Sequence, residues 1–290
     1  MFSSRRSFLE GLAAATALPG AVRPESFAAL EERSGGRIGV AAIACGTGRR
    51  VAHRGDEPFP LASTMKLPLV MAILHRVDIG RERLGRRIAF SSRDLEPPYS
   101  PIAERYPHGG RLTVAEISAL TIGHSDNTGA DLLLPLAGGP AGVTAYLRSI
   151  GIRNVRLDHA ERDLPPRATV HPARDAGTPA AMAALCARLI VNSPLSRDST
   201  ARLLGWMRAT VTGDQRLRAG VPAGWTVADK TGTYQNAAND VGLLFPPAGA
   251  PIAIACYTID APDDGGPGAI AGAAGLAVRM LTGTSAPHAQ

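Results

Sequence analysis

The chain has 290 residues, of which 45% are hydrophobic and 19% charged, and its formal net charge at pH 7 is +6. This length suits one large domain or two lobes with a sizeable buried core, and no segment supplies the ~18 uncharged apolar residues of a membrane anchor. Scattered arginines and few aromatic side chains argue against a nucleic-acid-binding groove.

The first residues have the features of an export signal. Arg5 and Arg6 precede Phe8-Leu9, and the weakly apolar run 11–18 that follows is too short to span a bilayer. This pattern resembles a twin-arginine signal peptide. We therefore assign residues 1–28 to a signal and expect a periplasmic or secreted protein. The cleavage point stays open, because both 15–17 and 26–28 have the small-residue pattern.

Strands are predicted near both ends of the chain and helices between them. The apolar and β-branched runs that favour strands are 37–45, a segment around 51, 225–233, 239–245 and 252–259. Helical spacing begins at residue 63 and recurs over 114–122, 128–136, 142–149, 179–191 and 269–281. Residues 158–178 lack periodicity, and a loop of that length in a compact domain is usually functional or disordered.

This order of elements predicts an α+β fold. We expect an antiparallel five-stranded sheet, built from both ends of the chain and flanked by N- and C-terminal helices, with an all-helical lobe inserted. Residues 29–60 and 208–286 would form the sheet-and-helix lobe and residues 61–207 the helical lobe. The active site would lie between the two lobes.

Only two of the 31 basic residues are lysines, Lys66 and Lys230. Arginine stays protonated, whereas the pKa of lysine falls when its ammonium is buried near another cation. The two lysines are therefore candidates for sites where arginine would not serve. A composition bias toward arginine that left two lysines by chance explains the observation equally well.

Three short motifs could carry nucleophilic chemistry. Ser63 and Lys66 are three residues apart on one helix face, where a lysine with a lowered pKa can activate the serine. Ser125 and Asn127 precede another helix, where a serine can relay a proton and an asparagine can hold an amide, although helix capping explains them as well. Each motif is weak alone.

The third motif is Lys230-Thr231-Gly232, followed by Thr233. Its lysine and hydroxyl can bind a carboxylate, its glycine lets a ligand approach the backbone, and the Thr233 N–H can donate to that ligand. The three motifs occur in the order found in class A β-lactamases and penicillin-binding proteins.

From about residue 31 to residue 281, the chain resembles the class A serine β-lactamases. The resemblance extends beyond the motifs to the segments 99–101, 125–128 running into 132–134, 138–140, 155–158, 178–179 and 222–225. It implies an acyl-enzyme on Ser63, made with Lys66 and Ser125, and a hydrolytic water activated by Glu161. Glu161 lies in the irregular loop, 36 residues after Ser125.

The resemblance also implies substrate-binding residues for a small β-lactam. They are Asn127, Lys230, Thr231, Gly232, Thr233, Arg216 (favoured over Arg218 for the substrate carboxylate) and Tyr99 at the site entrance. No metal or other cofactor is implied, and we expect a monomer.

Several positions depart from the family pattern. Pro165 replaces an asparagine that helps to hold the hydrolytic water, and His159 replaces an arginine that pairs with an aspartate, here Asp175, to fix the loop. We expect slow deacylation or an altered substrate range, because a loose loop positions groups poorly. Family members that hydrolyse carbapenems often have a cysteine immediately before the nucleophile, where this chain has Ala62. Tyr234 replaces an expected glycine.

Two other functions remain open. A penicillin-binding D,D-peptidase uses the same motifs, but Glu161 argues against it. A β-lactam sensor would acylate and stop, and Pro165 keeps that alternative open.

Overall fold

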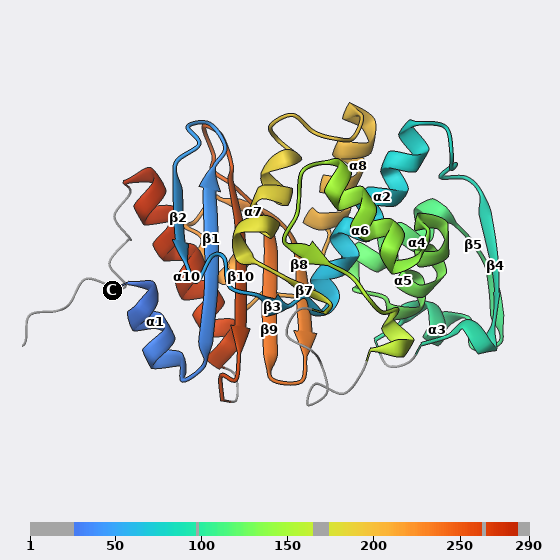
Figure 1. Cartoon of the computed structure of the whole chain (residues 1–290), viewed down its shortest axis with the longest axis horizontal. Coiled ribbons are helices and arrows are strands. Elements are labelled where there is room, and N and C mark those ends of the chain that lie inside the picture. The colour runs from blue at the N-terminus through green and yellow to red at the C-terminus, as the bar shows by residue number, and fades with distance from the viewer. Residues whose placement is uncertain (1–25, 97–98, 165–173, 263–264, 284–290) are drawn as a thin grey trace, which may run out of the picture.

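The computed structural model describes residues 26–96, 99–164, 174–262 and 265–283. Its central element is a five-stranded antiparallel sheet with the strand order β2-β1-β10-β9-β8 (Figure 1). The strands are β1 (Arg37–Ala44), β2 (Arg50–His53), β8 (Thr226–Tyr234), β9 (Ala237–Phe245) and β10 (Ile252–Ile259). Both ends of the chain therefore contribute to one sheet, as the order of the sequence patterns predicts.

The two faces of the sheet are covered by different parts of the chain. Strand β1 is buried on both faces, which explains its nearly continuous apolar run. Helices α1 (Phe27–Ser34) and α10 (Gly265–Thr282) pack on one face, where Ile38 and Val40 join Phe27 and Ile270 in one apolar cluster. Helix α7 (Pro179–Arg188) packs against β1, β9 and β10 on the other face.

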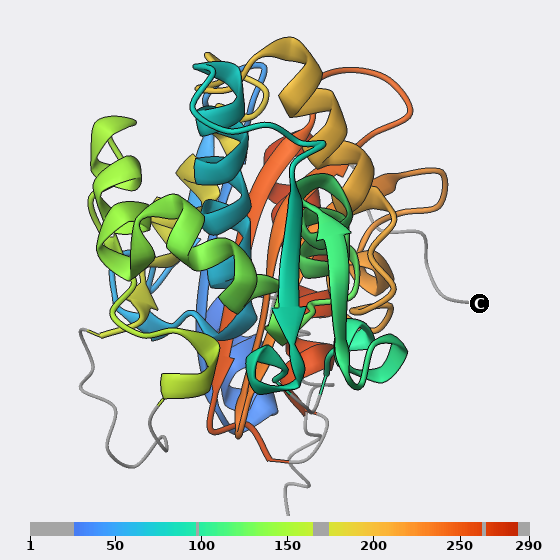
Figure 2. The ribbon, with the colours of Figure 1, turned by 90° about the vertical axis from the view of Figure 1, so that its right-hand side faces the viewer.

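The remaining helices form a second mass beside the sheet, seen end-on in Figure 2. They are α2 (Lys66–Asp78), α3 (Pro101–Arg105), α4 (Val114–Gly123), α5 (Asn127–Leu133), α6 (Gly139–Ser149) and α8 (Arg197–Arg208). The short helix α9 (Leu217–Gly220) packs instead against α10 and β8. Short 3-10 helices are η1 (Ala62–Met65), η2 (Ser92–Asp94), η3 (Leu134–Ala137) and η4 (Glu161–Asp163). The central helix α2 has nine consecutive buried residues, from Lys66 to Leu74.

Smaller strands complete the framework. Strands β3 (Phe59–Pro60), β7 (Ala176–Gly177) and β6 (Val155–Arg156) form a three-stranded sheet, and β4 (Arg87–Ser91) pairs with β5 (Gly109–Thr113). The β4–β5 hairpin lies in the foreground of Figure 2. The small sheet joins both ends of the irregular loop to the segment before Ser63.

Local sequence explains where most helices begin. Thr113 and Glu116 form a reciprocal capping box at α4, and Thr178 caps α7 ahead of Pro179 at its first turn. The predicted helix over 128–136 is divided, because α5 ends at Leu133 and η3 continues. Helix α8 and the β4–β5 hairpin were not predicted.

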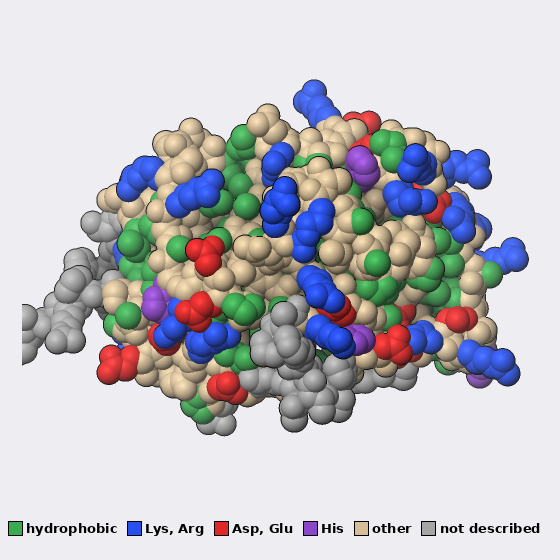
Figure 3. Space-filling model, viewed as in Figure 1, with side chains coloured by type: hydrophobic (Ala, Val, Ile, Leu, Met, Phe, Trp, Pro, Cys, Tyr) green, Lys and Arg blue, Asp and Glu red, His purple; other side chains and the backbone are tan. Residues whose placement is uncertain are grey.

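The surface agrees with scattered basic residues. On the face in Figure 3, Lys and Arg side chains are spread over several elements. No helix in the described part of the chain is both long and apolar enough to cross a membrane. The twin-arginine pattern lies outside the described residues.

Candidate active site

The segment that carries Ser63 is held in a constrained backbone. Ala62 has φ of +46°, a left-handed conformation that non-glycine residues rarely adopt. Asn239 on β9 donates from Nδ2 to the carbonyls of Pro60 (2.8 Å) and Leu61 (3.1 Å). Ser63 therefore lies at a fixed turn where the loop enters α2.

Lys66 lies at the centre of the sequence-predicted residues and is fully buried. Its Nζ donates to Ser63 Oγ (3.0 Å), to the Ser125 carbonyl (2.8 Å) and to Asn127 Oδ1 (2.5 Å). It also lies 3.0 Å from Glu161 Oε1. Burial lowers the pKa of Lys66, and the Glu161 carboxylate opposes that shift. Lys66 can therefore exchange a proton with Ser63.

The second lysine reaches the same serine from the sheet. Lys230 Nζ donates to Ser125 Oγ (2.9 Å) and to the Thr231 carbonyl (2.8 Å). Burial and the neighbouring charge of Lys66 lower the pKa of Lys230 to about 7. Ser125, whose φ is +58°, thus joins the two lysines, one through its hydroxyl and one through its carbonyl.

Asp126, between Ser125 and Asn127, is structural. One carboxylate oxygen accepts from the N–H of Gly129 (2.7 Å) and caps α5, and also accepts from Ser100 Oγ (2.9 Å). The other accepts from the N–H of Ile102 (2.8 Å). The helix cap that sequence analysis offered for this motif is therefore real, and it places the flanking Ser125 and Asn127 at Lys66.

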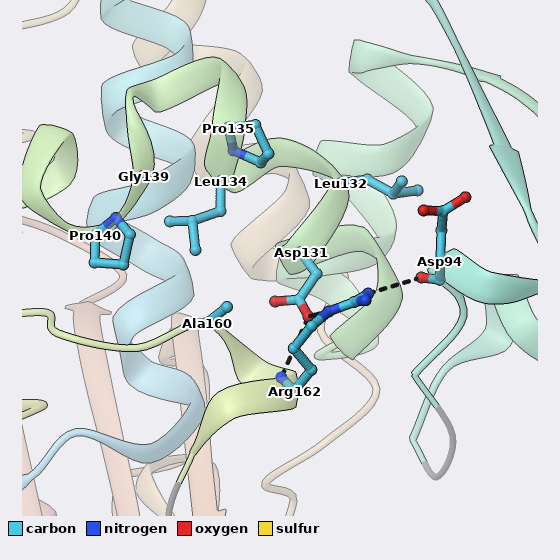
Figure 4. Close-up of a pocket in the computed structure, with 9 residues that line it drawn as sticks. All are labelled: Asp94, Asp131, Leu132, Leu134, Pro135, Gly139, Pro140, Ala160 and Arg162. Atoms are coloured by element: carbon cyan, nitrogen blue, oxygen red, sulfur yellow. Dashed lines mark hydrogen bonds and ion pairs between the residues drawn. The ribbon is translucent and has the colours of Figure 1, made fainter.

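Glu161 is positioned by an aspartate that sequence analysis missed. Asp131 on α5 accepts from the Glu161 N–H (2.8 Å) and from Arg162 Nε (3.0 Å). Figure 4 shows Arg162 reaching from η4 to Asp131 and to the Asp94 carbonyl, beside a cavity of about 500 Å³. This cavity is separate from the nucleophile, because Ser63 is not among the residues that line it. In the sequence, nothing distinguishes Asp131 from an ordinary charged residue of a helix. Its contact with the loop, 30 residues later in the chain, could therefore not be predicted.

Gly232 allows β8 to lie against the turn that carries Ser63. A Cβ at this position would lie 3.0 Å from the Leu61 carbonyl oxygen and 3.1 Å from the Thr64 backbone nitrogen. Those distances are too short for a side chain without movement of one element. The glycine therefore permits close approach of two protein segments. The hydroxyl of its neighbour Thr231 forms a hydrogen bond with the hydroxyl of Thr212 at 2.7 Å.

Arg216 is fixed under the end of β8. Its Nη2 donates to Thr233 Oγ1 (2.6 Å), and its Nη1 donates to the carbonyls of Gly232 (3.0 Å) and Asn239 (2.8 Å). Arg218 points elsewhere and pairs with Asp229 at 2.6 Å. The geometry thus brings Arg216, and not Arg218, to Gly232 and Thr233 at the predicted carboxylate-binding end of β8.

The rim contains two tyrosines. Tyr99 is 77% exposed, has φ of +67°, and accepts at its carbonyl from the Asn127 N–H (3.2 Å). Tyr234 ends β8 and pairs in register with Ala237, so a two-residue turn joins β8 to β9.

Comparison with known proteins agrees with this geometry. Residues 24–280 match the model of the Beta-lactamase enzyme family. The chain is 42% identical over 246 residues to the carbapenem-hydrolyzing β-lactamase KPC of Klebsiella oxytoca, covering 84% of this chain and 83% of that protein. It is 43% identical to β-lactamase AST-1 of Nocardia asteroides, covering 85% and 79%.

Solved structures specify the class. An ancestral class A β-lactamase of Gram-negative bacteria superposes with a TM-score of 0.82 at 48% identity, covering 87% of this chain and 97% of that one. A β-lactamase of Xanthomonas campestris pv. campestris gives 0.82 at 39% identity, covering 88% and 95%. The chain belongs to the class A β-lactamases. It is therefore a hydrolase of β-lactams.

One departure from the class A pattern has a structural explanation. His159 Nδ1 lies 2.5 Å from Asp175 Oδ2, while Asp175 Oδ1 accepts from the backbone N–H groups of Asp158 (2.8 Å) and His159 (3.0 Å). The Asp175 carbonyl also accepts from the Leu61 N–H at 2.9 Å. The histidine thus occupies the arginine's place in this class A enzyme. The other departure, Pro165, lies outside the described residues.

Within the described segments, no group of three or more His, Cys, Asp or Glu side chains could hold a metal ion. Cys45, Cys186 and Cys256 are free thiols, of which the last two are buried. Burial raises the pKa of all three, so they are held as thiols.

Proposed function

We propose that this protein opens the β-lactam ring of penicillins and cephalosporins through an acyl-enzyme on Ser63, and so confers resistance to these antibiotics. The observation that carries this proposal is the position of Lys66, whose Nζ is 3.0 Å from both Ser63 Oγ and Glu161 Oε1. One buried amine thus links a nucleophile to a carboxylate.

In acylation, Ser63 Oγ forms a bond to the lactam carbonyl carbon and gives its proton toward Lys66 or Glu161. The N–H groups of Ser63 and Thr233 stabilise the oxyanion, and the close packing of Gly232 keeps the two donors in register. The C–N bond then breaks, and Ser125, which accepts a hydrogen bond from Lys230, protonates the departing nitrogen. The proton taken from Ser63 then restores the Ser125 hydroxyl.

The substrate is held from two sides. Lys230, Thr231 and Arg216 bind its carboxylate, since two cations and a hydroxyl suit an anion. Asn127 holds the substrate amide, and the exposed ring of Tyr99 lines the entrance. Arg216 supports this role because its guanidinium already contacts the Thr233 hydroxyl at 2.6 Å.

In deacylation, Glu161 takes a proton from a water whose oxygen attacks the ester carbonyl. The C–O bond breaks and the proton returns to Ser63 Oγ. The anchoring of Glu161 by Asp131 supports this role, because a general base must be held close to its water.

The test is turnover of benzylpenicillin and a cephalosporin by the purified protein beside Glu161→Gln. We expect many turnovers by the parent and an acyl-enzyme that mass spectrometry detects in Glu161→Gln. A single stoichiometric burst from both proteins would refute the hydrolase and support the β-lactam sensor. Release of D-alanine from a peptidoglycan peptide, with no β-lactam turnover, would support the D,D-peptidase.

The proposed substrates are penicillins and cephalosporins. The relative KPC is named for carbapenem hydrolysis. This chain has Ala62 before the nucleophile, and all three of its cysteines are free. Carbapenem turnover, measured in the same assay, would extend the proposal.

We also propose export by the twin-arginine route, a two-lobe division at residues 60–61 and 207–208 with the site between the lobes, and action as a monomer without a cofactor. The hydrogen bond from Lys230 on β8 to Ser125 supports the lobe division with the site between the lobes, because the two residues come from the segments assigned to different lobes.

A further inference from the structure

Two carboxyl groups lie beneath the site and take no part in the proposed chemistry. Asp229 precedes Lys230 on β8, and Asp240 lies on β9 opposite Thr231 in register. They are diagonal neighbours on the same face of the sheet, and their side chains are in hydrogen-bond contact. Both are fully buried.

Their hydrogen bonds leave one oxygen of each carboxyl group without a donor. Asp229 Oδ1 accepts from Arg218 Nη2 at 2.6 Å, and Asp240 Oδ2 accepts from the Leu217 N–H at 3.2 Å. Asp229 Oδ2 and Asp240 Oδ1 are buried and have no hydrogen-bond partner among the described residues. Buried polar atoms are normally paired, and two buried carboxylates in contact cannot both ionise.

We propose that Asp229 and Asp240 share one proton and act as a single buried negative charge that keeps Lys230 protonated. The proton lies between the two oxygens that lack another donor, so both are satisfied. The charge resides on Asp229, because Arg218 contacts that carboxylate, and the proton resides on Asp240. Burial and the charge of Asp229 raise the pKa of Asp240 well above its usual value.

The charges around the pair fit this assignment. Arg218 and Arg216 face it from α9 and the preceding turn, and the charge of Lys230, the residue after Asp229 on β8, acts on it from the other face of the sheet. The other titratable groups near Asp240 are Cys186 on α7 and Cys256 and Tyr257 on β10. Burial raises the pKa of each of these three, so each stays neutral.

The consequence concerns Lys230. Its burial and the charge of Lys66 lower its pKa, whereas the charges of Asp240, Asp229 and Glu161 raise it. The proposed function, on which this inference rests, needs Lys230 as a cation to bind the substrate carboxylate. The aspartate pair is therefore a positioning element that extends the alkaline limit of the enzyme.

The first experiment compares Asp240→Asn with the double variant Asp229→Asn/Asp240→Asn. In Asp240→Asn, the amide can donate to Asp229 Oδ2, and the single negative charge remains. In the double variant, neither of the two side chains carries a negative charge. We expect the alkaline limb of kcat/KM for benzylpenicillin to stay at the parent's pH in Asp240→Asn and to move down by about one pH unit in the double variant.

Unfolding temperatures of both variants, measured with the pH profiles, separate a loss of fold from a shift in the limb. A double variant that is folded and keeps the parent's alkaline limb would overturn the proposed effect on Lys230. Equal downward shifts in both variants would overturn the shared proton, because Asp240→Asn should conserve the charge.

The second experiment reads the proton directly and needs no activity or variant. Infrared spectra of the parent, with and without ¹³C-labelled aspartate, should contain the carbonyl band of a buried protonated carboxyl group at pH 7. Absence of this band would overturn the proposal even if the enzyme is fully active. Its presence in a protein that turns over no β-lactam would refute the proposed function and leave the shared proton standing.

Discussion

Gly232 provides a sharp test of how closely β8 must lie against the nucleophile turn. The Cβ of Gly232→Ala would lie 3.0 Å from the Leu61 oxygen and 3.1 Å from the Thr64 backbone nitrogen, so one element must move by a few tenths of an ångström. Such overpacking should cost about 1–3 kcal/mol of unfolding free energy. Because the shift misplaces the Thr233 N–H, kcat/KM should fall about 10- to 100-fold.

The assay is steady-state hydrolysis of a chromogenic cephalosporin, with urea unfolding in parallel. Gly205→Ala is the matched control, because Gly205 lies in α8 and a Cβ there has no heavy atom within 4 Å. This control should keep the parent's kcat/KM and gain about 0.5–1 kcal/mol. A Gly232→Ala variant with the parent's kcat/KM would refute the argument that close packing of β8 positions the oxyanion donor.

Three further predictions concern stability, the loop and processing. Contacts with Arg54 lower the pKa of Glu31 to about 2, so its contribution is present above the ordinary pKa near 4.5 and is lost as pH falls through about 2. After solvent screening, Glu31→Gln should cost about 1–2 kcal/mol at pH 7 and almost nothing at pH 2, by urea unfolding; an equal cost at both pH values would contradict this. His159→Ala should prolong the acyl-enzyme measured by mass spectrometry, with His159→Arg restoring the parent's lifetime through Asp175; rapid turnover of every substrate by His159→Ala would contradict the anchoring role. Phe27 is buried in the core, so the proposed removal of the signal should leave an N-terminus that precedes it, and intact-mass measurement showing removal of residues 26–28 would contradict this.

Long regular elements were predictable from sequence, and those stabilised by distant partners were not. The run 37–45 predicted β1, and 252–259 predicted β10, because apolar β-branched segments favour strands. Helix α8 has an amphipathic pattern, with Leu203, Leu204 and Met207 buried and charged residues exposed, that sequence analysis overlooked. The β4–β5 hairpin has no short turn motif, since a whole helix, α3, lies between its strands.

The residues of the active site also divide into those that could be predicted from the sequence and those that could not. Ser63, Lys66 and Ser125 could be found because their chemistry requires particular residue types at short spacings. Asp131 and Asp240 act through contacts with segments far along the chain. Nothing in the local sequence distinguishes such residues from ordinary charges, and only the folded arrangement shows that they are buried and paired.

The position of β1 has a consequence for biosynthesis. Arg37 pairs in register with Ile259, so the second strand-forming partner of β1 is made only when almost the whole chain exists. Such distant pairing delays formation of the sheet until synthesis is nearly complete. Until then β1 has an unpaired hydrogen-bonding edge, which favours aggregation. A ribosome that stops before residue 252 would therefore release a chain that needs a chaperone rather than a smaller folded protein.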